Sequence, residues 1–543
     1  MEDIYIDIPS AVNEPVKNYS PGSDERASLK SKLASMENEF YEIPIIIGGK
    51  EIHTGNLGKS RKPHDHQHIL AEYHQAGIKE VNQAIDSAID SWHSWSEFPL
   101  YERASIFRRA AELLAGPWRD IVNAATMLNQ SKNVYQSEID AACELIDFFK
   151  FNVQYMSQLY KEQPESSPGI WNRLEHRPLE GFVFALTPFN FTSICANLCA
   201  APAMLGNVVV WKPAETQIYS AQVIMDLFKA AGLPDGVINM VTVSGKEISK
   251  VVFEDKNFAG LHFTGSTNVF RTLWKGIGNN IEKYKSYPRI VGETGGKDFI
   301  FSHVSADPNE LAASLIRGAY EYQGQKCSAA SRAYIPESLW ATFRDQLCDQ
   351  VQQIAYGDVS DFTNFMGAVI DESAYTLLTR YIDAAKADTA ADILCGGSYD
   401  KDTGYFIAPT IIQAHDPHYA TMETELFGPV LTVFVYPDNK YAETLDLCDQ
   451  TSPYALTGSI FARDRQAINL AYEKLRHSAG NFYINDKPTG AVVGQQPFGG
   501  SRASGTNDKA GSYLNLIRWI SPRTTKENFF PAHDYRYPYM QEE

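Results

Sequence analysis

The chain has 543 residues, of which 44% are hydrophobic, 21% are charged and 12% are aromatic, enough for large cores in roughly two to four domains. Its formal net charge of −18 argues against nucleic acid or an anionic membrane as the main partner, because both are bound by clustered Lys and Arg. The seven cysteines are scattered without a Cys-x-x-Cys pair, so we expect a reducing compartment, no disulfide framework and no metal site.

The N-terminus and the hydropathy predict neither export nor a membrane span. The first residues, Met-Glu-Asp-Ile-Tyr-Ile-Asp, are acidic, whereas secretory signals begin with basic residues and transit peptides are rich in Arg. No apolar stretch reaches the roughly 18 residues that a spanning helix needs. We therefore expect a cytoplasmic protein, or one of the mitochondrial matrix if this is a processed eukaryotic chain.

The first part of the chain predicts an arm, a hairpin and a run of helices. Residues 1–40 are polar, with Pro and Ser, and are expected to form a surface arm that ends in a helix. Residues 43–54 contain a Gly-Gly pair between two apolar runs, which is typical of a β-hairpin. From about 76 to 162, apolar residues recur at spacings of three and four, which predicts helices.

From residue 181 onward, short β-branched runs alternate with helical patterns. Strands are expected at 182–186, 208–211 and 237–241, with helices ending near 205 and spanning 218–231. This alternation predicts right-handed crossovers and a parallel sheet, which binds ligands at the carboxyl ends of its strands. No Gly-x-Gly-x-x-Gly follows a strand, so a dinucleotide cofactor has to be argued from other residues.

A second alternation of strands and helices runs from about 298 to 488 and predicts a second α/β domain. Its expected strands include 332–335, 431–436 and 458–461. The tail 521–543 carries clustered Pro and aromatic residues, so we expect it to dock on another surface.

Three short runs supply the groups for covalent aldehyde chemistry. They place Asn190 in Leu-Thr-Pro-Phe-Asn-Phe-Thr, Glu293 in Val-Gly-Glu-Thr-Gly-Gly-Lys and Cys327 in Gly-Gln-Lys-Cys-Ser. A Cys327 thiolate could attack an aldehyde, the Asn190 amide could stabilise the oxyanion beside the Cys327 N–H, and Glu293 could activate water to hydrolyse the thioester. Because only the thiolate attacks, we expect a helix end or a cation to lower the pKa of Cys327. The alternative interpretation is a buried cysteine, an Asx turn and a surface carboxylate.

Six ordered motifs, from about residue 40 onward, resemble the aldehyde dehydrogenase superfamily. They are Thr-Pro-Phe-Asn-Phe (187–191), Trp-Lys-Pro-Ala-Glu (211–215), Phe-Thr-Gly-Ser (263–266), Glu-Thr-Gly-Gly-Lys (293–297), Gly-Gln-Lys-Cys (324–327) and Glu-Leu-Phe-Gly-Pro (425–429). The resemblance implies an α/β fold of two parallel-sheet domains plus a small antiparallel oligomerisation arm. The implied divisions are an N-terminal arm (1–40), an NAD-binding domain (41–164 and 182–297), a catalytic domain (298–510) and the oligomerisation arm (165–181 and 511–543). Such an arm exposes sheet edges and implies a homodimer or a higher homo-oligomer.

Within the superfamily, the runs at 480–487 and 494–509 most resemble the L-glutamate γ-semialdehyde dehydrogenases, also called Δ1-pyrroline-5-carboxylate dehydrogenases. This resemblance implies NAD-dependent oxidation of L-glutamate γ-semialdehyde to L-glutamate, the second step of proline breakdown, through a thioester on Cys327.

The resemblance also implies a set of residues that bind the cofactor NAD: Thr187, Lys212, Glu215, Gly265, Ser266, Glu425 and Phe427. Lys212 and Glu215 are expected at the adenosine ribose, where a carboxylate repels a 2′-phosphate and so favours NAD over NADP. Gly265 and Ser266 open a helix whose N–H groups would face the pyrophosphate. Glu425 is expected to hold the nicotinamide ribose, with Phe427 beside the ring.

A second implied set binds the substrate: Ser328, Gly490, Ala491, Phe191 and Phe498. The two phenylalanines are expected to flank the aliphatic chain, and the other three to bind the carboxylate. Many relatives have a serine where this chain has Ala491, so one hydroxyl is missing. A hydrogen bond to a charged group is worth roughly 1.5–3 kcal/mol, which puts the substrate affinity in question.

Three alternatives stay open at this stage. The enzyme could oxidise another acidic semialdehyde such as succinate semialdehyde. Comparing the oxidation rates of substrates with and without the α-amino group distinguishes these two possibilities. It could be a catalytically silent paralogue, although all three reactive residues are present. It could also transfer the acyl group to coenzyme A, in which case glutamate would not be released without coenzyme A.

Overall fold

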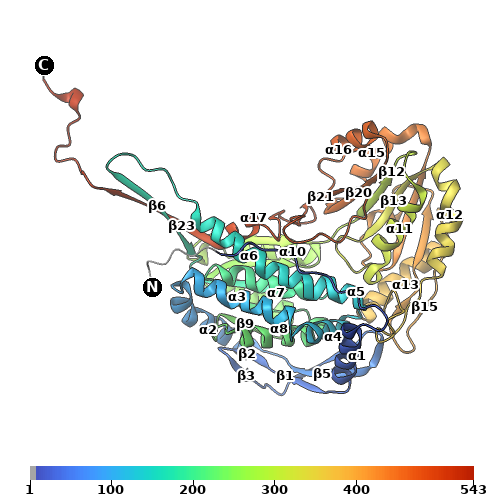
Figure 1. Ribbon diagram of the computed structural model, residues 1–543, viewed down its shortest axis with the longest axis horizontal. Helices are drawn as coiled ribbons and strands as arrows, with labels where there is room; N and C mark the ends of the chain where they lie inside the picture. The colour runs from blue at the N-terminus through green and yellow to red at the C-terminus, as the bar shows by residue number, and fades with distance from the viewer. Residues whose placement is uncertain (1–7, 543) are drawn as a thin grey trace.

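A computed structural model describes residues 8–542 and contains two α/β bodies, each built around a seven-stranded sheet (Figure 1). A two-stranded ribbon projects from the first body, and the C-terminal tail continues beyond it. None of the described helices is long and apolar enough to cross a membrane.

The sheet of the first body has the strand order β11-β10-β7-β8-β9-β2-β3. Five strands run parallel: β7 (Phe182–Leu186), β8 (Val208–Lys212), β9 (Ile238–Met240), β10 (Phe258–Thr264) and β11 (Arg289–Glu293). The antiparallel hairpin of β2 (Ile45–Ile47) and β3 (Lys50–Ile52) completes the sheet. The predicted hairpin, the predicted strands and their parallel order are thus confirmed.

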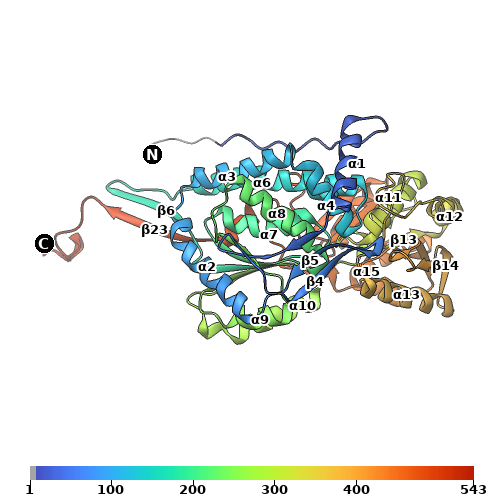
Figure 2. The ribbon, with the colours of Figure 1, turned by 90° about the horizontal axis from the view of Figure 1, so that it is seen from below.

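Helices cover both faces of this sheet. Figure 2 shows α3 (Leu100–Ala115), α6 (Glu144–Lys161), α7 (Thr192–Met204) and α8 (Ile218–Ala231) on one side, and α9 (Gly245–Glu254) and α10 (Thr267–Asn279) on the other. The helical window expected from 76 to 162 is confirmed, with α2 (Ile78–Ser96), α4 (Arg119–Gln130) and α5 (Val134–Ser137) as its other members. A π-helical turn, η1 (Glu138–Cys143), joins α5 to α6. Such turns are often found at functional sites.

The sheet of the second body has the order β14-β17-β18-β13-β12-β20-β21. Its parallel strands are β12 (Asp298–Ser302), β13 (Ala330–Pro336), β17 (Thr410–Ala414), β18 (Val430–Tyr436), β20 (Thr457–Phe461) and β21 (Asn481–Ile484). β14 (Ala391–Cys395) closes one edge in antiparallel orientation. The helices around it are α11 (Pro308–Tyr320), α12 (Glu337–Gln352), α13 (Glu372–Ala387), α15 (Tyr441–Gln450) and α16 (Arg465–Lys474). The predicted second α/β unit is confirmed.

The projecting ribbon pairs two segments that lie far apart in sequence. β6 (Ile170–Pro178) runs antiparallel to β23 (Ile520–Asn528) along the full length of both strands. Just before β23, Trp519 is fully buried in the core of the first body, so the ribbon itself begins at residue 520. Beyond it, Phe530 and Tyr535 are 81% and 88% exposed in the single chain. Docking of this tail therefore stays a prediction.

The N-terminal segment lies along the first body and, as expected, ends in a helix. Residues 8–23 carry no helix or strand and lead into α1 (Asp24–Glu37), which packs on α4. After α1, β1 (Tyr41–Ile43), β4 (Leu57–Lys62) and β5 (Asp65–His74) form a separate three-stranded sheet.

Candidate active site

Four of the predicted site residues lie at one edge of the first sheet, where its parallel strands end. Lys212 and Glu293 are the last residues of β8 and β11, and Thr187 and Gly265 directly follow β7 and β10. The Thr187 N–H donates to the Lys212 carbonyl (3.2 Å), and the Gly265 N–H donates to the Glu293 carbonyl (3.1 Å). The topology therefore brings the predicted cofactor residues and the predicted base to the edge where parallel sheets bind ligands.

The segment before Cys327 is a tight turn in unusual backbone conformations. Tyr322 and Gln323 have φ of 51° and 54°, the left-handed region, which costs roughly 1–3 kcal/mol per residue other than glycine. Gly324 has φ of 67°, and a Cβ there would lie 2.3 Å from the carbonyl oxygen of Gly428. The Gln323 amide compensates by donating to the carbonyls of Ser131 (2.9 Å) and Ala368 (2.8 Å).

The Glu-Thr-Gly-Gly run packs against the second body without room for side chains. A Cβ on Gly295 would lie 2.1 Å from Oε2 of Glu425, and one on Gly296 would lie 2.4 Å from the carbonyl oxygen of Cys327. The Gly296 N–H donates to Oε1 of Glu425 (2.8 Å). The two glycines thus let three predicted residues from distant segments, Glu293, Glu425 and Cys327, approach one another.

A small cavity of about 50 Å³ holds the predicted nucleophile, the predicted base and all five predicted substrate residues. Its lining comprises Cys327, Glu293, Ser328, Gly490, Ala491, Phe191 and Phe498, together with Asp140, Glu144, Phe148, Ile194, Lys326, Thr489, Val493, Gln496 and Ala510. The Ser328 and Thr489 hydroxyls are hydrogen-bonded to each other at 2.8 Å. The cavity therefore places a thiol, a carboxyl and a polar loop within reach of one small molecule.

The electrostatic environment of Cys327 is the opposite of the one expected. Burial, followed by the charges of Glu293, Asp298 and Glu425, raises the pKa of the Cys327 thiol well above its usual value. Burial likewise raises the pKa of Glu293 to about 8. The predicted lowering of the thiol pKa is therefore wrong, and the thiol needs a proton acceptor. Glu293, whose pKa lies near neutrality, is suited to that task.

Lys326 adjoins Cys327 in sequence but is paired with acids. Its ammonium lies 3.5 Å from a carboxylate oxygen of Asp140 and 3.6 Å from one of Glu321. Asp140 also pairs with Lys132 at 3.0 Å. The positive charge of Lys326 is thus offset by two buried carboxylates, which explains why it does not lower the pKa of the thiol.

Asn190 is buried and contacts the turn that carries the nucleophile. Its Nδ2 donates to the carbonyl of Gln325 at 3.1 Å, and the side chain does not line the cavity. The amide is therefore anchored two residues before Cys327. Its role as an oxyanion donor stays a proposal.

The remaining predicted cofactor residues occupy well-defined places. The Ser266 hydroxyl caps α10 by accepting from the Val269 N–H (3.4 Å). Burial lowers the pKa of Lys212, and Glu215 is exposed on a pocket of about 570 Å³. Burial raises the pKa of Glu425 to about 7. Phe427 has φ of 58° and packs its ring edge-on against Phe189, with centroids 5.8 Å apart.

Two acids that line the cavity were missed from the sequence. Asp140 and Glu144 lie on η1 and at the start of α6, four residues apart. Ser193 donates its hydroxyl to Glu144 (2.5 Å), and burial raises the pKa of Glu144 to about 8. The signal that could have found them is a pair of acids at helical spacing within an otherwise apolar run.

One group of potential metal ligands, Glu42, His53 and His74, occurs among the described residues. Their facing atoms lie 2.7–3.0 Å apart, as in a hydrogen-bonded cluster. The Gly55 N–H donates to Nδ1 of His74 (3.1 Å), which leaves the imidazole proton on Nε2, the atom that would have to bind a metal. The geometry therefore favours hydrogen bonding at this place.

Comparison with known proteins identifies the family. The model for the aldehyde dehydrogenase family matches residues 53–520, and the chain belongs to this family. Δ1-pyrroline-5-carboxylate dehydrogenase of Dictyostelium discoideum, named as mitochondrial, is 52% identical over 98% of this chain and 96% of its own length. The corresponding protein of Agaricus bisporus is 49% identical over 98% and 97%. The crystal structure of Δ-pyrroline-5-carboxylate dehydrogenase from Mycobacterium tuberculosis bound with NAD has a TM-score of 0.96 at 50% identity, covering 99% of this chain and 100% of that one. The predicted family and fold class are confirmed.

Proposed function

We propose that this protein catalyses the NAD-dependent oxidation of L-glutamate γ-semialdehyde to L-glutamate, the second step of proline degradation. The observation that carries the proposal is the cavity in which Cys327 and Glu293 face the loop with Thr489, Gly490 and Ala491. The names of relatives that match almost the whole chain support the same substrate. An NAD-bound structure of the same shape supports the cofactor.

The first chemical step joins the thiol to the aldehyde. Glu293 accepts the proton of Cys327, and the sulfur attacks the carbonyl carbon to give a thiohemiacetal. We assign the stabilisation of the oxygen that becomes negative to the Cys327 N–H and to the Asn190 amide, whose Nδ2 carries a second hydrogen besides the one donated to the Gln325 carbonyl. One such donor is worth roughly 2.7–4 kcal/mol in the transition state. When bound, NAD accepts the hydride that leaves this carbon, so that a thioester remains on Cys327.

The second step returns the enzyme to its starting state. Glu293 first passes the proton that it took from Cys327 to solvent. It then removes a proton from water, the hydroxide adds to the thioester carbonyl, and the C–S bond breaks with release of L-glutamate. The thiolate is the leaving group and is reprotonated. A carboxyl group with a pKa of about 8 can both accept and return protons near neutrality.

The cofactor residues fit a dinucleotide at the sheet edge. Thr187, Lys212 and Gly265 follow strand ends, and Ser266 caps α10, whose first-turn N–H groups suit a pyrophosphate. We place the adenosine ribose at Lys212 and Glu215. Glu425 and Phe427 belong to the second body and would complete the nicotinamide side.

The cavity fits a short zwitterion. The backbone at Gly490 and Ala491, with the hydroxyls of Ser328 and Thr489, offers donors for a carboxylate. Phe191 and Phe498 would flank the methylene groups. Two acids, Asp140 and Glu144, line the same cavity, and their oxygens could accept hydrogen bonds from an α-ammonium group.

The test is NADH formation by the purified full chain with glutamate semialdehyde, with succinate semialdehyde as the competitor. A much higher kcat/KM for glutamate semialdehyde supports the proposal. A preference for succinate semialdehyde would show that the proposed substrate is wrong. Release of free glutamate without coenzyme A separates hydrolysis from acyl transfer.

Ala491→Ser is expected to lower KM for glutamate semialdehyde roughly tenfold, because the added hydroxyl can donate to the substrate carboxylate. The neighbouring Val492 does not line the cavity, so Val492→Thr is the matched control and should leave KM unchanged. Steady-state kinetics at saturating NAD measures both variants. An unchanged KM in Ala491→Ser would show that the substrate carboxylate does not bind at this position of the loop.

We further propose a homodimer built on the ribbon of β6 and β23. Both of its strands are edges, and isolated two-stranded sheets are marginal in water. A pocket of about 670 Å³ at its base, lined by Trp92, Tyr160, Arg177 and Tyr287 among others, offers a surface for a second copy. Light scattering of the full chain tests this. We also propose that the protein lies in the cytoplasm or, if this is a processed eukaryotic chain, in the mitochondrial matrix.

A further inference from the structure

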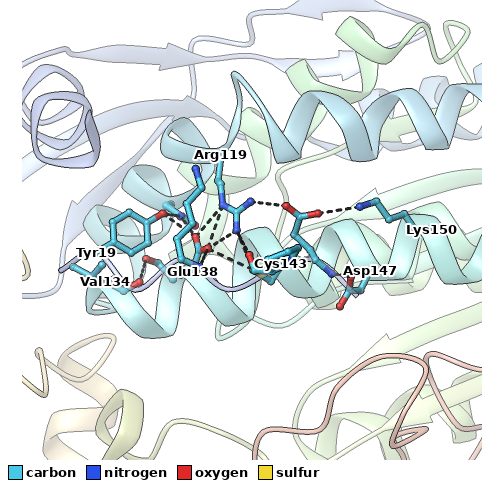
Figure 3. A network of polar contacts seen from close by, with 12 residues as sticks. Tyr19, Arg119, Val134, Glu138, Cys143, Asp147 and Lys150 are labelled. Carbon is cyan, nitrogen blue, oxygen red and sulfur yellow. Dashed lines mark hydrogen bonds and ion pairs between the residues drawn. The ribbon is translucent and has the colours of Figure 1, made fainter. Parts of the chain in front are cut away.

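The N-terminal arm reaches the substrate loop from outside the catalytic body. Residues 11–19 lie against α6 and η1, where the Ala11 N–H donates to the Gln154 side chain (2.6 Å) and the Lys17 N–H donates to Glu138 (2.9 Å). Figure 3 shows the polar network at the arm, including Tyr19, Arg119 and Glu138. These elements are those that carry Asp140 and Glu144 into the cavity.

The side-chain amide of Asn13 links the N-terminal arm to α6 and to the loop that contains Val493 and Gln495. Its Nδ2 donates both to Oδ2 of Asp147 on α6 (2.8 Å) and to the carbonyl of Val493 (2.8 Å). Its Oδ1 accepts from the side chain of Gln495 (2.9 Å). Val493 lies in the loop whose residues 489–491 were assigned to the substrate carboxylate, and it lines the same cavity.

Asn13 is itself held firmly by its neighbour. The Glu14 N–H donates to Oδ1 of Asp147 (2.7 Å), and the Glu14 carboxylate pairs with Arg119 (2.7 Å) and Lys150 (2.9 Å). Figure 3 shows Arg119, Asp147 and Lys150. Arg119 in turn forms an ion pair with Glu138, whose side chain is fully buried. A buried and fully paired group of this kind fixes the position of the arm.

The loop needs support from outside because it has little structure of its own. No helix or strand lies between the end of β21 at residue 484 and residue 501. Gly494 is packed so closely on α6 that a Cβ would lie 2.3 Å from the ring of Phe151. Binding groups on a loop are precise only where neighbouring hydrogen bonds lock them.

We propose that Asn13 is a positioning residue for substrate recognition, which fastens the 489–496 loop to α6 so that its N–H groups face the substrate carboxylate. Asn13 touches neither substrate nor cofactor and acts through Val493 and Gln495. The inference rests on the proposed oxidation of glutamate semialdehyde. It extends the recognition site to the N-terminal arm, where Asn13 lies 480 residues before Val493 in sequence.

The experiment compares Asn13→Ala and Gln495→Ala with the control Asn18→Ala. Asn18 lies in the same arm and is exposed, and within residues 8–542 its side chain accepts hydrogen bonds only from Ser20. For the two test variants we expect KM for glutamate semialdehyde and Kd for L-glutamate to rise about 5- to 30-fold, the effect of losing one or two such bonds. We expect kcat, KM for NAD, Tm and kcat/KM for propanal, which lacks a carboxylate, to match those of Asn18→Ala. Gln495 is exposed, so its truncation should not impair folding.

The outcomes separate the two levels of the proposal. Wild-type activity with unchanged KM and Kd in both test variants would overturn the role of Asn13 and leave the proposed function intact. An equal loss for propanal and glutamate semialdehyde, with a lower Tm, would also overturn it, because that pattern indicates a merely structural role. A wild-type enzyme that does not oxidise glutamate semialdehyde would defeat the proposed function itself.

Discussion

Cys327→Ala is expected to abolish aldehyde oxidation, with a loss of at least about 10⁴-fold, while the protein stays folded. Cys327 lines the cavity and is partly exposed, whereas Cys195 and Cys199 are fully buried. No hydroxyl or thiol would remain at that position to form the thiohemiacetal. NADH formation and Tm measure the two expectations.

The matched control is Cys348→Ala. Cys348 is also partly exposed but lies on α12 and does not line the cavity, so its variant should keep wild-type activity. Mass spectrometry after rapid quenching should find the acyl adduct on the peptide with Cys327. Appreciable activity in Cys327→Ala, or an adduct on another cysteine, would refute the assignment of the nucleophile.

Glu293→Gln is expected to reduce kcat by about 10²- to 10⁴-fold, the usual contribution of a general base. Because the carboxylate is the active form and burial raises the pKa of Glu293 to about 8, wild-type activity should rise with pH and reach half of its plateau near pH 8. The variant should lose this dependence. If thioester hydrolysis is the step most impaired, the acyl-enzyme should accumulate in the variant after a single turnover.

The same pKa predicts a change in stability with a definite sign. The ordinary pKa of a glutamate is 4.5, and the pKa of Glu293 in the folded protein is about 8. The fold therefore favours the protonated carboxyl, and its stabilising effect is lost as the pH rises from about 4.5 to about 8. Glu293→Gln, which is always neutral, should have a higher Tm than wild type at pH 8 and a similar Tm near pH 4.5.

The exposed Glu254 provides the control for both measurements. It lies at the end of α9 and is not part of the cavity, so Glu254→Gln should preserve kcat, the pH profile and Tm. A Glu293→Gln enzyme with the kcat and pH profile of wild type would show that another group is the base.

Most of the fold followed from local patterns. The apolar run at 218–231 predicted α8 with its observed ends, and the β-branched run at 208–211 predicted β8 to within one residue. The Gly-Gly pair predicted the turn between β2 and β3, where both glycines have positive φ. Local side-chain periodicity decides such elements, because each element buries one face or one stripe of residues.

Part of the site was also predictable from sequence. Cys327, Glu293 and the residues of the 489–491 loop were selected by motif, and the fold places them around one cavity. In these motifs the backbone needs glycine at fixed positions, as at Gly296 beside the Cys327 carbonyl.

The sequence by itself therefore determined the family and the alternation of strands and helices, and it selected the candidate reactive groups, since these depend on local patterns and residue types. Only the tertiary structure decided the protonation of those groups, because burial, followed by the charges of Glu293, Asp298 and Glu425, raises the pKa of Cys327. Only the tertiary structure brought Asp140 and Glu144 to the cavity and Asn13 to the substrate loop. Burial and contacts between distant segments arise when the whole chain packs, and no local periodicity encodes them.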